Sequence, residues 1–128
     1  MTLAVARLPR WTMEAEQGLG ETLDGYAAEF ARQVDAGIAE LWKFGARTFA
    51  ITRIEKCADH PPELVVCCLK GDRLPSVARV LIAAAKRQGL GGIRFHTRRA
   101  GLGRMTRAFG FSELERVYFL DLTGVSDG

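Results

Sequence analysis

The sequence predicts an α/β domain in which helices flank a mixed β-sheet. Segments with helical periodicity alternate with short runs of apolar and β-branched residues that are typical of strands. One run, residues 64–69, is continuously apolar, as expected for a central strand that is buried on both faces. The length of 128 residues, 48% of them hydrophobic and 26% charged, fits one domain with its own core. The predicted order of elements is β-α-β-β-α-β-α-β.

The first third of the chain predicts a short edge strand and a long helix. Residues 2–8 alternate loosely and stop at Pro9, whereas residues 11–20 indicate a loop or a brief helical turn. From Glu21 onward, apolar residues recur every three or four positions, which predicts one amphipathic helix that ends at a C-cap glycine, Gly45. The apolar stripe consists of Leu23, Ala27, Phe30, Val34, Ile38 and Leu41.

The middle of the chain predicts a β-hairpin followed by a helix. Residues 48–56 and 63–69 are rich in β-branched and apolar side chains and flank a turn that contains two prolines. The helix is expected over residues 74–88, because Pro75 suits a first helical turn and Gly89 suits the position after the last.

The last third predicts a strand, a short helix and a final strand. These elements are expected over residues 93–98, 102–109 and 115–122, and the polar residues 123–128 are expected to form a flexible tail. No composition shift or linker divides the sequence, so residues 1–128 are predicted to be a single domain.

Charge is distributed unevenly along the chain. The net charge is +3, but residues 73–112 contain nine basic side chains and no acidic one, whereas the segments before and after each carry −3. Such a segment predicts either a site for an anionic partner or a solvated face that the acidic first helix neutralises. The arginines expected to contact an anionic partner are Arg94, Arg98, Arg99, Arg104 and Arg107.

The cysteines and the hydropathy pattern indicate a soluble cytoplasmic protein. Cys57, Cys67 and Cys68 are odd in number and lack the spacing of metal ligands, so no metal site is expected. Adjacent strand residues point to opposite faces, so Cys67 and Cys68 are predicted not to share a site. No apolar run approaches the roughly 18–20 residues of a membrane helix, and residues 1–13 lack the pattern of a signal peptide.

Turn and packing residues in the second half carry a resemblance to a known family. The predicted hairpin precedes a helix that ends in Lys-Arg-Gln-Gly at residues 86–89, and the strand Gly-Ile-Arg-Phe-His-Thr follows at residues 92–97. The short helix then closes on Phe-Gly-Phe-Ser-Glu at residues 109–113. Together these features resemble the GCN5-related N-acetyltransferase (GNAT) family over roughly residues 45–122. The resemblance implies the fold of that family.

The functional motifs of the family match less well. The family holds acyl-CoA with a loop of the form Arg/Gln-x-x-Gly-x-Gly/Ala, whereas residues 72–77 here read Asp-Arg-Leu-Pro-Ser-Val. The family's general-acid tyrosine corresponds to Thr106, and a frequent asparagine corresponds to Arg99. These departures predict a degenerate member that has no catalytic residues and binds no cofactor.

Three functional hypotheses follow. The first is a non-catalytic acetyltransferase-like module that acts through a protein partner or through self-association. Such a module would be similar to accessory or virion-associated phage proteins, and it would be located in the virion if a phage encodes it. The alternative is an active N-acetyltransferase with a divergent phosphate loop, in which acetyl-CoA is bound by Arg73, Arg98, Arg99 and Arg104 and the amine attacks directly. The third is nucleic-acid binding through residues 73–112, which predicts affinity that falls steeply with salt.

Overall fold

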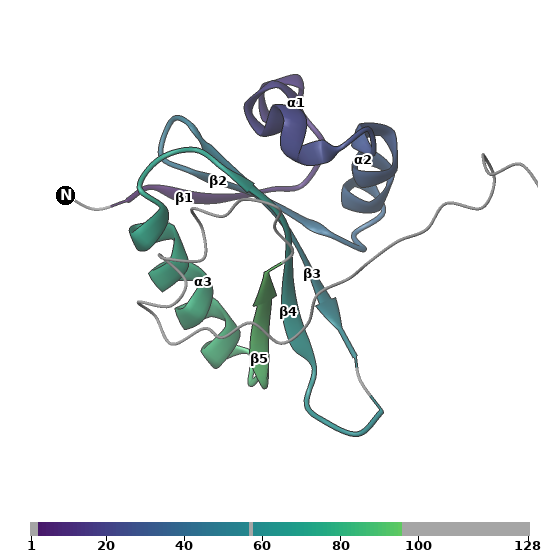
Figure 1. The fold of residues 1–128 in the computed structure, drawn as a ribbon, viewed down its shortest axis with the longest axis vertical. Coiled ribbons are helices and arrows are strands. Elements are labelled where there is room, and N and C mark those ends of the chain that lie inside the picture. The colour runs from purple at the N-terminus through teal and green to yellow at the C-terminus, as the bar shows by residue number, and fades with distance from the viewer. Residues whose placement is uncertain (1–2, 57, 96–128) are drawn as a thin grey trace, which may run out of the picture. The chain divides into compact units, whose positions relative to one another are not determined.

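The computed structural model describes residues 3–56 and 58–95, all of which belong to one compact unit. A five-stranded sheet in the order β1-β2-β3-β4-β5 forms its centre, with α1 and α2 on one face and α3 on the other (Figure 1). In chain order the elements are β1 (Val5–Leu8), α1 (Met13–Leu19), the 3₁₀ helix η1 (Gly20–Leu23), α2 (Ala27–Asp35), β2 (Glu40–Phe44), β3 (Thr48–Glu55), β4 (Glu63–Lys70), α3 (Leu74–Arg87) and β5 (Gly92–Phe95).

The sheet is mixed, which confirms the predicted α/β class. Neighbouring strands from β1 to β4 are antiparallel, and β5 lies parallel to β4 after the crossover through α3. The predicted hairpin corresponds to β3 and β4, and the predicted helix over residues 74–88 corresponds to α3. Outside the described residues lie the end of the strand predicted over 93–98, the helix over 102–109, the strand over 115–122 and the tail over 123–128.

The single long helix expected from Glu21 is wrong. The segment instead forms η1, α2 and the strand β2. Asp24 and Gly25 adopt positive φ angles of 50° and 82° between the two helices, and Gly37 turns the chain after α2 at φ 76°. A helix cannot continue through such residues. Gly45 is not a helix cap, because it lies in the turn between β2 and β3.

Strand pairing explains why the end of this segment becomes β2. Residues 40–44 pair with β1 on one side and with β3 on the other, so their backbone groups are satisfied by two ladders. Leu41 packs toward α1 and α2, whereas Trp42 and Phe44 pack toward α3. The three- and four-residue spacing of the apolar residues therefore resembled a helix although it spans two helices and a strand.

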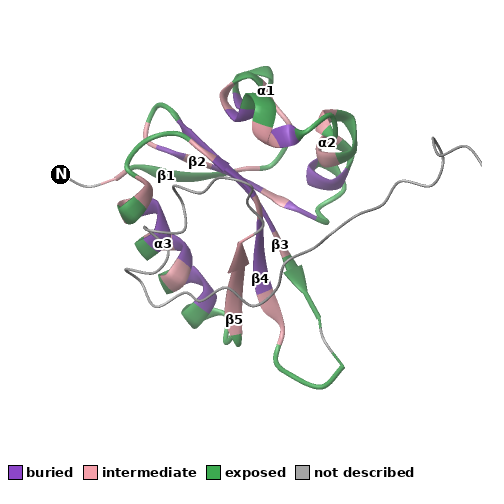
Figure 2. Ribbon diagram, in the orientation of Figure 1, coloured by how far each residue is buried: buried purple, intermediate pink, exposed green. Residues whose placement is uncertain are grey.

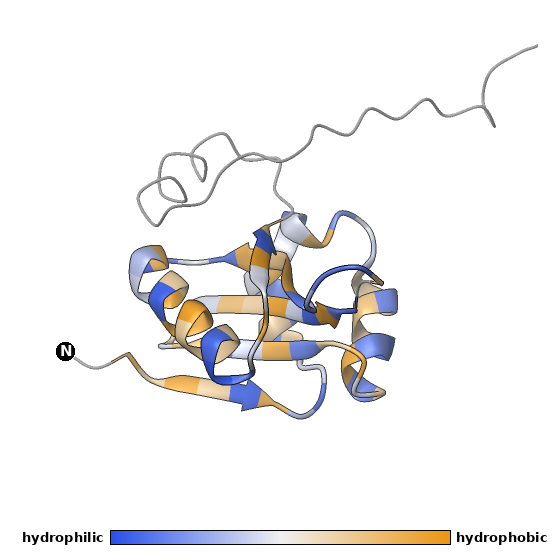
Figure 3. Ribbon diagram, turned by 90° about the horizontal axis from the view of Figure 1, so that it is seen from below, coloured by the Kyte–Doolittle hydropathy of each residue, from blue (hydrophilic) through white to orange (hydrophobic). Residues whose placement is uncertain are grey.

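The face covered by α3 holds the larger apolar cluster. Trp42 stacks on Phe44 with ring centroids 5.7 Å apart, and the Trp42 indole N–H donates to Thr52 Oγ1 at 2.8 Å. Burial of a leucine such as Leu81 of α3 contributes about 1.5–3 kcal/mol. The buried side of α3 faces the sheet and its exposed side faces outward (Figure 2). The same division is visible by hydropathy, with apolar residues concentrated along the sheet (Figure 3).

Residues of α1 and α2 pack on the opposite face of the sheet. Thr12 caps α1 by accepting the Ala15 N–H at 3.1 Å, and Gly18 allows α1 to lie directly against the Phe49 ring. None of the helices in residues 3–56 and 58–95 is long and apolar enough to span a membrane.

Candidate functional site

A β-bulge interrupts β4 in the middle of the sheet. The register with β3 steps from Ile51 opposite Cys68 to Thr52 opposite Val66, so Cys67 has no partner residue on β3. On the other side, the described part of β5 pairs with β4 only as far as Val66. Within the described strands, Cys67 is therefore outside the ladder on both sides. The extra residue of a β-bulge is left outside the regular pairing of the two strands.

The bulge also corrects the prediction that Cys67 and Cys68 face opposite sides. Cys68 is buried in the cluster beneath α1 and α2, and Cys67 packs against the same cluster. An extra residue in one strand shifts the alternation of side chains by one, and this brings both thiols to one face. The register that creates the bulge depends on β3, so local sequence does not reveal it.

Both thiols are held in the protonated state. Burial raises the pKa of Cys67, although the neighbouring Arg53 guanidinium partly opposes that effect. Burial, with a smaller contribution from Cys67, raises the pKa of Cys68 to about 11. A thiolate is the reactive form of cysteine, so neither residue is suited to act as a nucleophile at neutral pH. Cys57 lies outside the described residues.

The loop between β4 and α3 is fixed to the first residue of β3. The Asp72 N–H donates to Thr48 Oγ1 at 2.9 Å, and the Thr48 hydroxyl lies 2.8 Å from the Asp72 carbonyl oxygen and 3.1 Å from its Oδ1. Gly71, at φ 146°, crosses Thr48 so closely that a Cβ would lie 2.5 Å from Thr48 Cα. The glycine of this loop thus serves a contact with the sheet, which fixes the backbone from which α3 begins.

The start of α3 presents the positive end of the helix dipole, with the Asp72 carboxylate in the loop before it bonded to Thr48. Its first turn contains no acidic side chain, and the N–H groups of Leu74 and Ser76 stand at the positive end of the helix dipole. Pro75 lacks an N–H, and the Val77 N–H donates to the Arg73 carbonyl at 3.1 Å. Arg73 occupies the N-cap position in the left-handed conformation, at φ 56°, and is exposed. Of the four arginines predicted to bind acetyl-CoA, Arg73 therefore lies at the helix start, and Arg98, Arg99 and Arg104 lie outside the described residues.

The bulge and the start of α3 belong to the same end of β4. Cys67 lies three residues before the strand ends at Lys70, and α3 begins at Leu74. Because β4 and β5 are parallel and joined through α3, this is the carboxyl end of a parallel pair. Ligands of open α/β sheets bind at that position.

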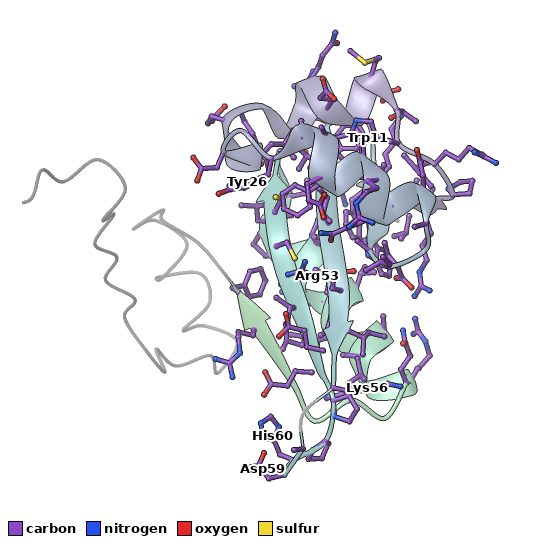
Figure 4. All side chains as sticks on the ribbon, turned by 90° about the vertical axis from the view of Figure 1, so that its right-hand side faces the viewer. Trp11, Tyr26, Arg53, Lys56, Asp59 and His60 are labelled. Atoms are coloured by element: carbon purple, nitrogen blue, oxygen red, sulfur yellow. The ribbon has the colours of Figure 1, made fainter. Side chains whose placement is uncertain are left out.

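Arg53 lies on the face of the sheet that carries α1 and α2. Its Nη1 donates to Gln33 Oε1 at 3.1 Å, and Gln33 Nε2 in turn donates to Glu29 Oε1 at 3.1 Å. Its Nη2 lies 3.7 Å from Glu55 Oε1, which is an ion pair at the limit of contact. In Figure 4, Arg53 is seen on this face below Tyr26, whereas Lys56, Asp59 and His60 lie around the tip of the β3–β4 hairpin.

A small open pocket of about 170 Å³ lies where β3 extends beyond the start of β2. Two of the residues that line it, Ile38 and Ile54, are large and apolar and are 55% and 43% exposed. Arg53 borders this pocket, and its guanidinium is close enough to Cys67 to oppose the rise in the pKa of that thiol. The lining residues are Gly37, Ile38, Glu40, Thr52, Arg53 and Ile54.

Arg94 is committed to a contact within the sheet. It pairs with Glu63 through Nε to Oε2 at 3.0 Å and Nη2 to Oε1 at 3.4 Å, and this hydrogen bonding lowers the pKa of Glu63. The prediction that Arg94 contacts an anionic partner stays a prediction, as does that for Arg98, Arg99, Arg104 and Arg107, which lie outside the described residues. Among the residues that the structure describes, no cluster of His, Cys, Asp and Glu is arranged to hold a metal ion.

Two parts of the site have weak signals in the sequence. The bulge at Cys67 results from the register between β4 and β3. Two adjacent cysteines in an apolar strand do not predict it. Arg53 is the one charged residue in the otherwise apolar and β-branched stretch 48–54. That pattern could have identified Arg53 as a candidate site residue, because a charged side chain that faces other elements requires polar partners.

Solved structures with the same fold include proteins that are named as acetyltransferases. The chain aligns with the aminoglycoside N-acetyltransferase AAC(6')-Iy in complex with CoA at a TM-score of 0.66, 22% identity and 94% of each chain covered. It aligns with a predicted acetyltransferase with acetyl-CoA from Clostridium acetobutylicum at a TM-score of 0.64 and 9% identity, and the alignment covers 98% of this chain and 100% of the other. With the aminoglycoside antibiotic 6'-N-acetyltransferase AAC(6')-Ih from Acinetobacter baumannii, the TM-score is 0.62 and the identity 12%. That alignment covers 94% of this chain and 97% of the other. These likenesses confirm the GNAT fold that the sequence resemblance implied. No protein-family model matches the sequence, and neither does any curated protein sequence.

Proposed function

We propose that this protein is an acetyl-CoA-dependent N-acetyltransferase. The observation that carries the proposal is the β-bulge at Cys67 together with the start of α3, both at the carboxyl end of a parallel strand pair. The solved structures of this fold include one with CoA and one with acetyl-CoA. They favour the alternative sequence hypothesis over the non-catalytic module, and no finding supports a phage or virion role.

The residues present fit a ligand that has a thioester at one end and a pyrophosphate along its length. The N–H groups of Leu74 and Ser76 and the Arg73 side chain would bind the phosphates, because they combine hydrogen-bond donors with positive charge. The Cys67 peptide would orient the thioester carbonyl. The three contacts between Thr48 and Asp72 hold the loop that family members build with further glycines. The departures over residues 72–77 are therefore compatible with binding.

Acetyl-CoA would supply an activated acyl group. As the N–C bond forms and the C–S bond breaks, CoA would leave as the thiolate, and the proton that the acceptor nitrogen gives up would pass through water to that thiolate. The protein's own part is positioning, which alone lowers the barrier of a two-substrate reaction substantially. Because burial keeps the thiols of Cys67 and Cys68 protonated, we expect direct attack by the amine and no acyl-cysteine intermediate.

Titration calorimetry with acetyl-CoA at about 150 mM salt, near physiological ionic strength, tests the proposal. We compare the wild type with Ser76→Asp and with Ala83→Asp, a matched change at an exposed site in the middle of α3. An acidic residue in the first turn stabilises a helix but repels phosphate, so Ser76→Asp should fold well and bind acetyl-CoA at least about tenfold more weakly. Ala83→Asp should bind like the wild type. Wild-type protein that shows no saturable binding would contradict the proposal.

A further inference from the structure

β1 is the first strand in the order of the sheet, and it has a strand partner on one side. It pairs with β2, and no other strand in residues 3–56 and 58–95 pairs with it (Figure 1). Three of its four side chains are apolar, and residues 5–7 are exposed. An edge with exposed apolar side chains and unpaired peptide groups is a template for pairing with another strand.

The pairing with β2 determines which peptide groups of β1 point outward. The Ala4 carbonyl accepts the Gly45 N–H at 2.7 Å, which continues the register between the two strands. In an antiparallel ladder, residues that bond to the partner strand alternate with residues that do not. Ala4 and Ala6 therefore bond to β2. The peptide groups of Val5 and Arg7 point to the open side of β1.

The one charged residue of β1 does not protect this edge. Natural edge strands are commonly blocked by charged side chains, prolines or bulges. The Arg7 guanidinium lies over the ring of Trp42, 4.3 Å from its centroid, and Arg7 Nη1 lies 3.6 Å from Glu40 Oε1. Both of these partners belong to β2, so the charge is held over the chain's own sheet. Pro9 follows only after the strand has ended.

The side chains beside the open edge suit a second copy of the same strand. Leu3 packs against the apolar cluster that α3 covers, and Val5 lies opposite Phe44 of that cluster, so both side chains are on the α3 face. Two copies of β1 that run antiparallel about a two-fold axis at Val5 bring the two Val5 side chains together on this face. An axis at Arg7 would instead place two like charges opposite each other, which is unfavourable.

The register centred on Val5 also uses the outward peptide groups fully. Leu3, Val5 and Arg7 alternate with the residues that bond to β2, so all three present N–H and C=O groups to the second copy. An axis at Ala6 would place Leu3 opposite Pro9, which has no N–H to donate. Pairing occupies the β1 edge of both chains, so the assembly closes at two chains.

We infer that this protein forms a two-fold symmetric dimer in which the two β1 strands pair antiparallel and join the two sheets into one. Val5, which is 42% exposed in the single chain, becomes buried at the axis. The inference does not rest on the proposed function, because β2 and β3 separate β1 from the bulged strand β4. Dimer formation and acetyl-CoA binding are therefore measured separately.

Sedimentation velocity of the full chain tests the inference at about 1–200 μM, where weak dimers dissociate. Val5→Lys should weaken the dimer at least about tenfold, because it removes the apolar contact and opposes like charges at the axis. Val5→Pro should do the same, since proline lacks the outward N–H and is tolerated on edge strands. Ile38→Lys, at a residue 55% exposed elsewhere, should dimerise like the wild type. A monomeric wild type, or a Val5→Lys dimer as tight as the wild type, would overturn the inference.

Cysteine cross-linking by oxidised glutathione tests the register. Across an axis at Val5, the two Val5 Cα atoms would lie about 5.5 Å apart, within the range that a disulfide spans. The two Ala6 Cα atoms would lie on a diagonal, at about 7–8 Å, which is too far. Val5→Cys should therefore form a disulfide-linked dimer faster than Ala6→Cys, with the wild type as the background for the native cysteines. Equal rates in the two variants, or no dimer above the wild-type background, would contradict it.

Discussion

At the scale of single residues, the site depends on a few contacts that fix the backbone. Gly71 and Thr48 are the main pair, because their close approach sets the path of the chain from β4 into α3. Arg53 and Gln33 play the same part on the other face of the sheet. The two residues of each pair are 20 or more positions apart in the sequence, so neither residue by itself predicts the contact.

Gly71→Ala should destabilise the protein by about 2 kcal/mol or more, through a clash with Thr48 added to an unfavourable φ angle. Gly37→Ala is the matched control, since Gly37 also has a positive φ but nothing lies within 4 Å of its Cβ position. The control should lose only about 1 kcal/mol. Urea denaturation measures both free energies of unfolding, and equal losses would show that the contact with Thr48 carries no cost.

Thr48→Val and Thr52→Val form a second matched pair, because both threonines are fully buried and bonded. Each change leaves one N–H without an acceptor, that of Asp72 or that of the Trp42 indole, and should cost about 1–3 kcal/mol. Only Thr48→Val releases the loop before α3. We therefore expect weaker acetyl-CoA binding in Thr48→Val alone, measured by calorimetry below the unfolding temperature of both variants. Equal affinities of the two variants for acetyl-CoA would show that this loop does not contribute to binding it.

At the scale of elements, the sequence predicts what local periodicity determines. β3, β4 and α3 agree with their predicted ranges to within one or two residues, because each has a consistent pattern and a clear boundary such as Pro75 or Gly89. The long predicted helix failed because pairing with β1 and β3 and three residues with positive φ overrode a helical spacing. The bulge escaped prediction since it is a property of two strands together.

The Glu63–Arg94 pair joins β4 to β5 and gives this connection a pH dependence. Hydrogen bonding to Arg94 lowers the pKa of Glu63 in the folded protein. A lowered pKa means that the pair contributes stability above the unfolded-state pKa of glutamate, about 4.3, and loses it as pH falls through the folded-state value. We expect Glu63→Gln to be less stable than the wild type at neutral pH and equally stable in strong acid. Thermal unfolding across that range measures it, and a constant difference would remove the pair as the cause.

At the scale of the whole molecule, the charge pattern and the fold predict different partners. The +9 segment over residues 73–112 would attract any polyanion, whereas the bulge and the start of α3 form the proposed site for acetyl-CoA. Of the charged side chains in that segment, Arg94 is already paired with Glu63, and Arg73 lies at the proposed site. The geometry therefore favours a specific ligand over general attraction.

Salt dependence distinguishes these two outcomes in the intact protein. Binding that neutralises 6–10 phosphates of duplex DNA should fall by roughly 10³–10⁵ between 50 and 200 mM salt. Acetyl-CoA binding should fall far less, because backbone N–H groups at the start of α3 supply directional hydrogen bonds that salt screens weakly. We expect one acetyl-CoA per chain at about 200 mM salt, with DNA binding no longer detectable, in parallel titrations of the same sample. If DNA binding persists there and acetyl-CoA binding does not, the basic segment and not the bulge of β4 defines what this protein binds.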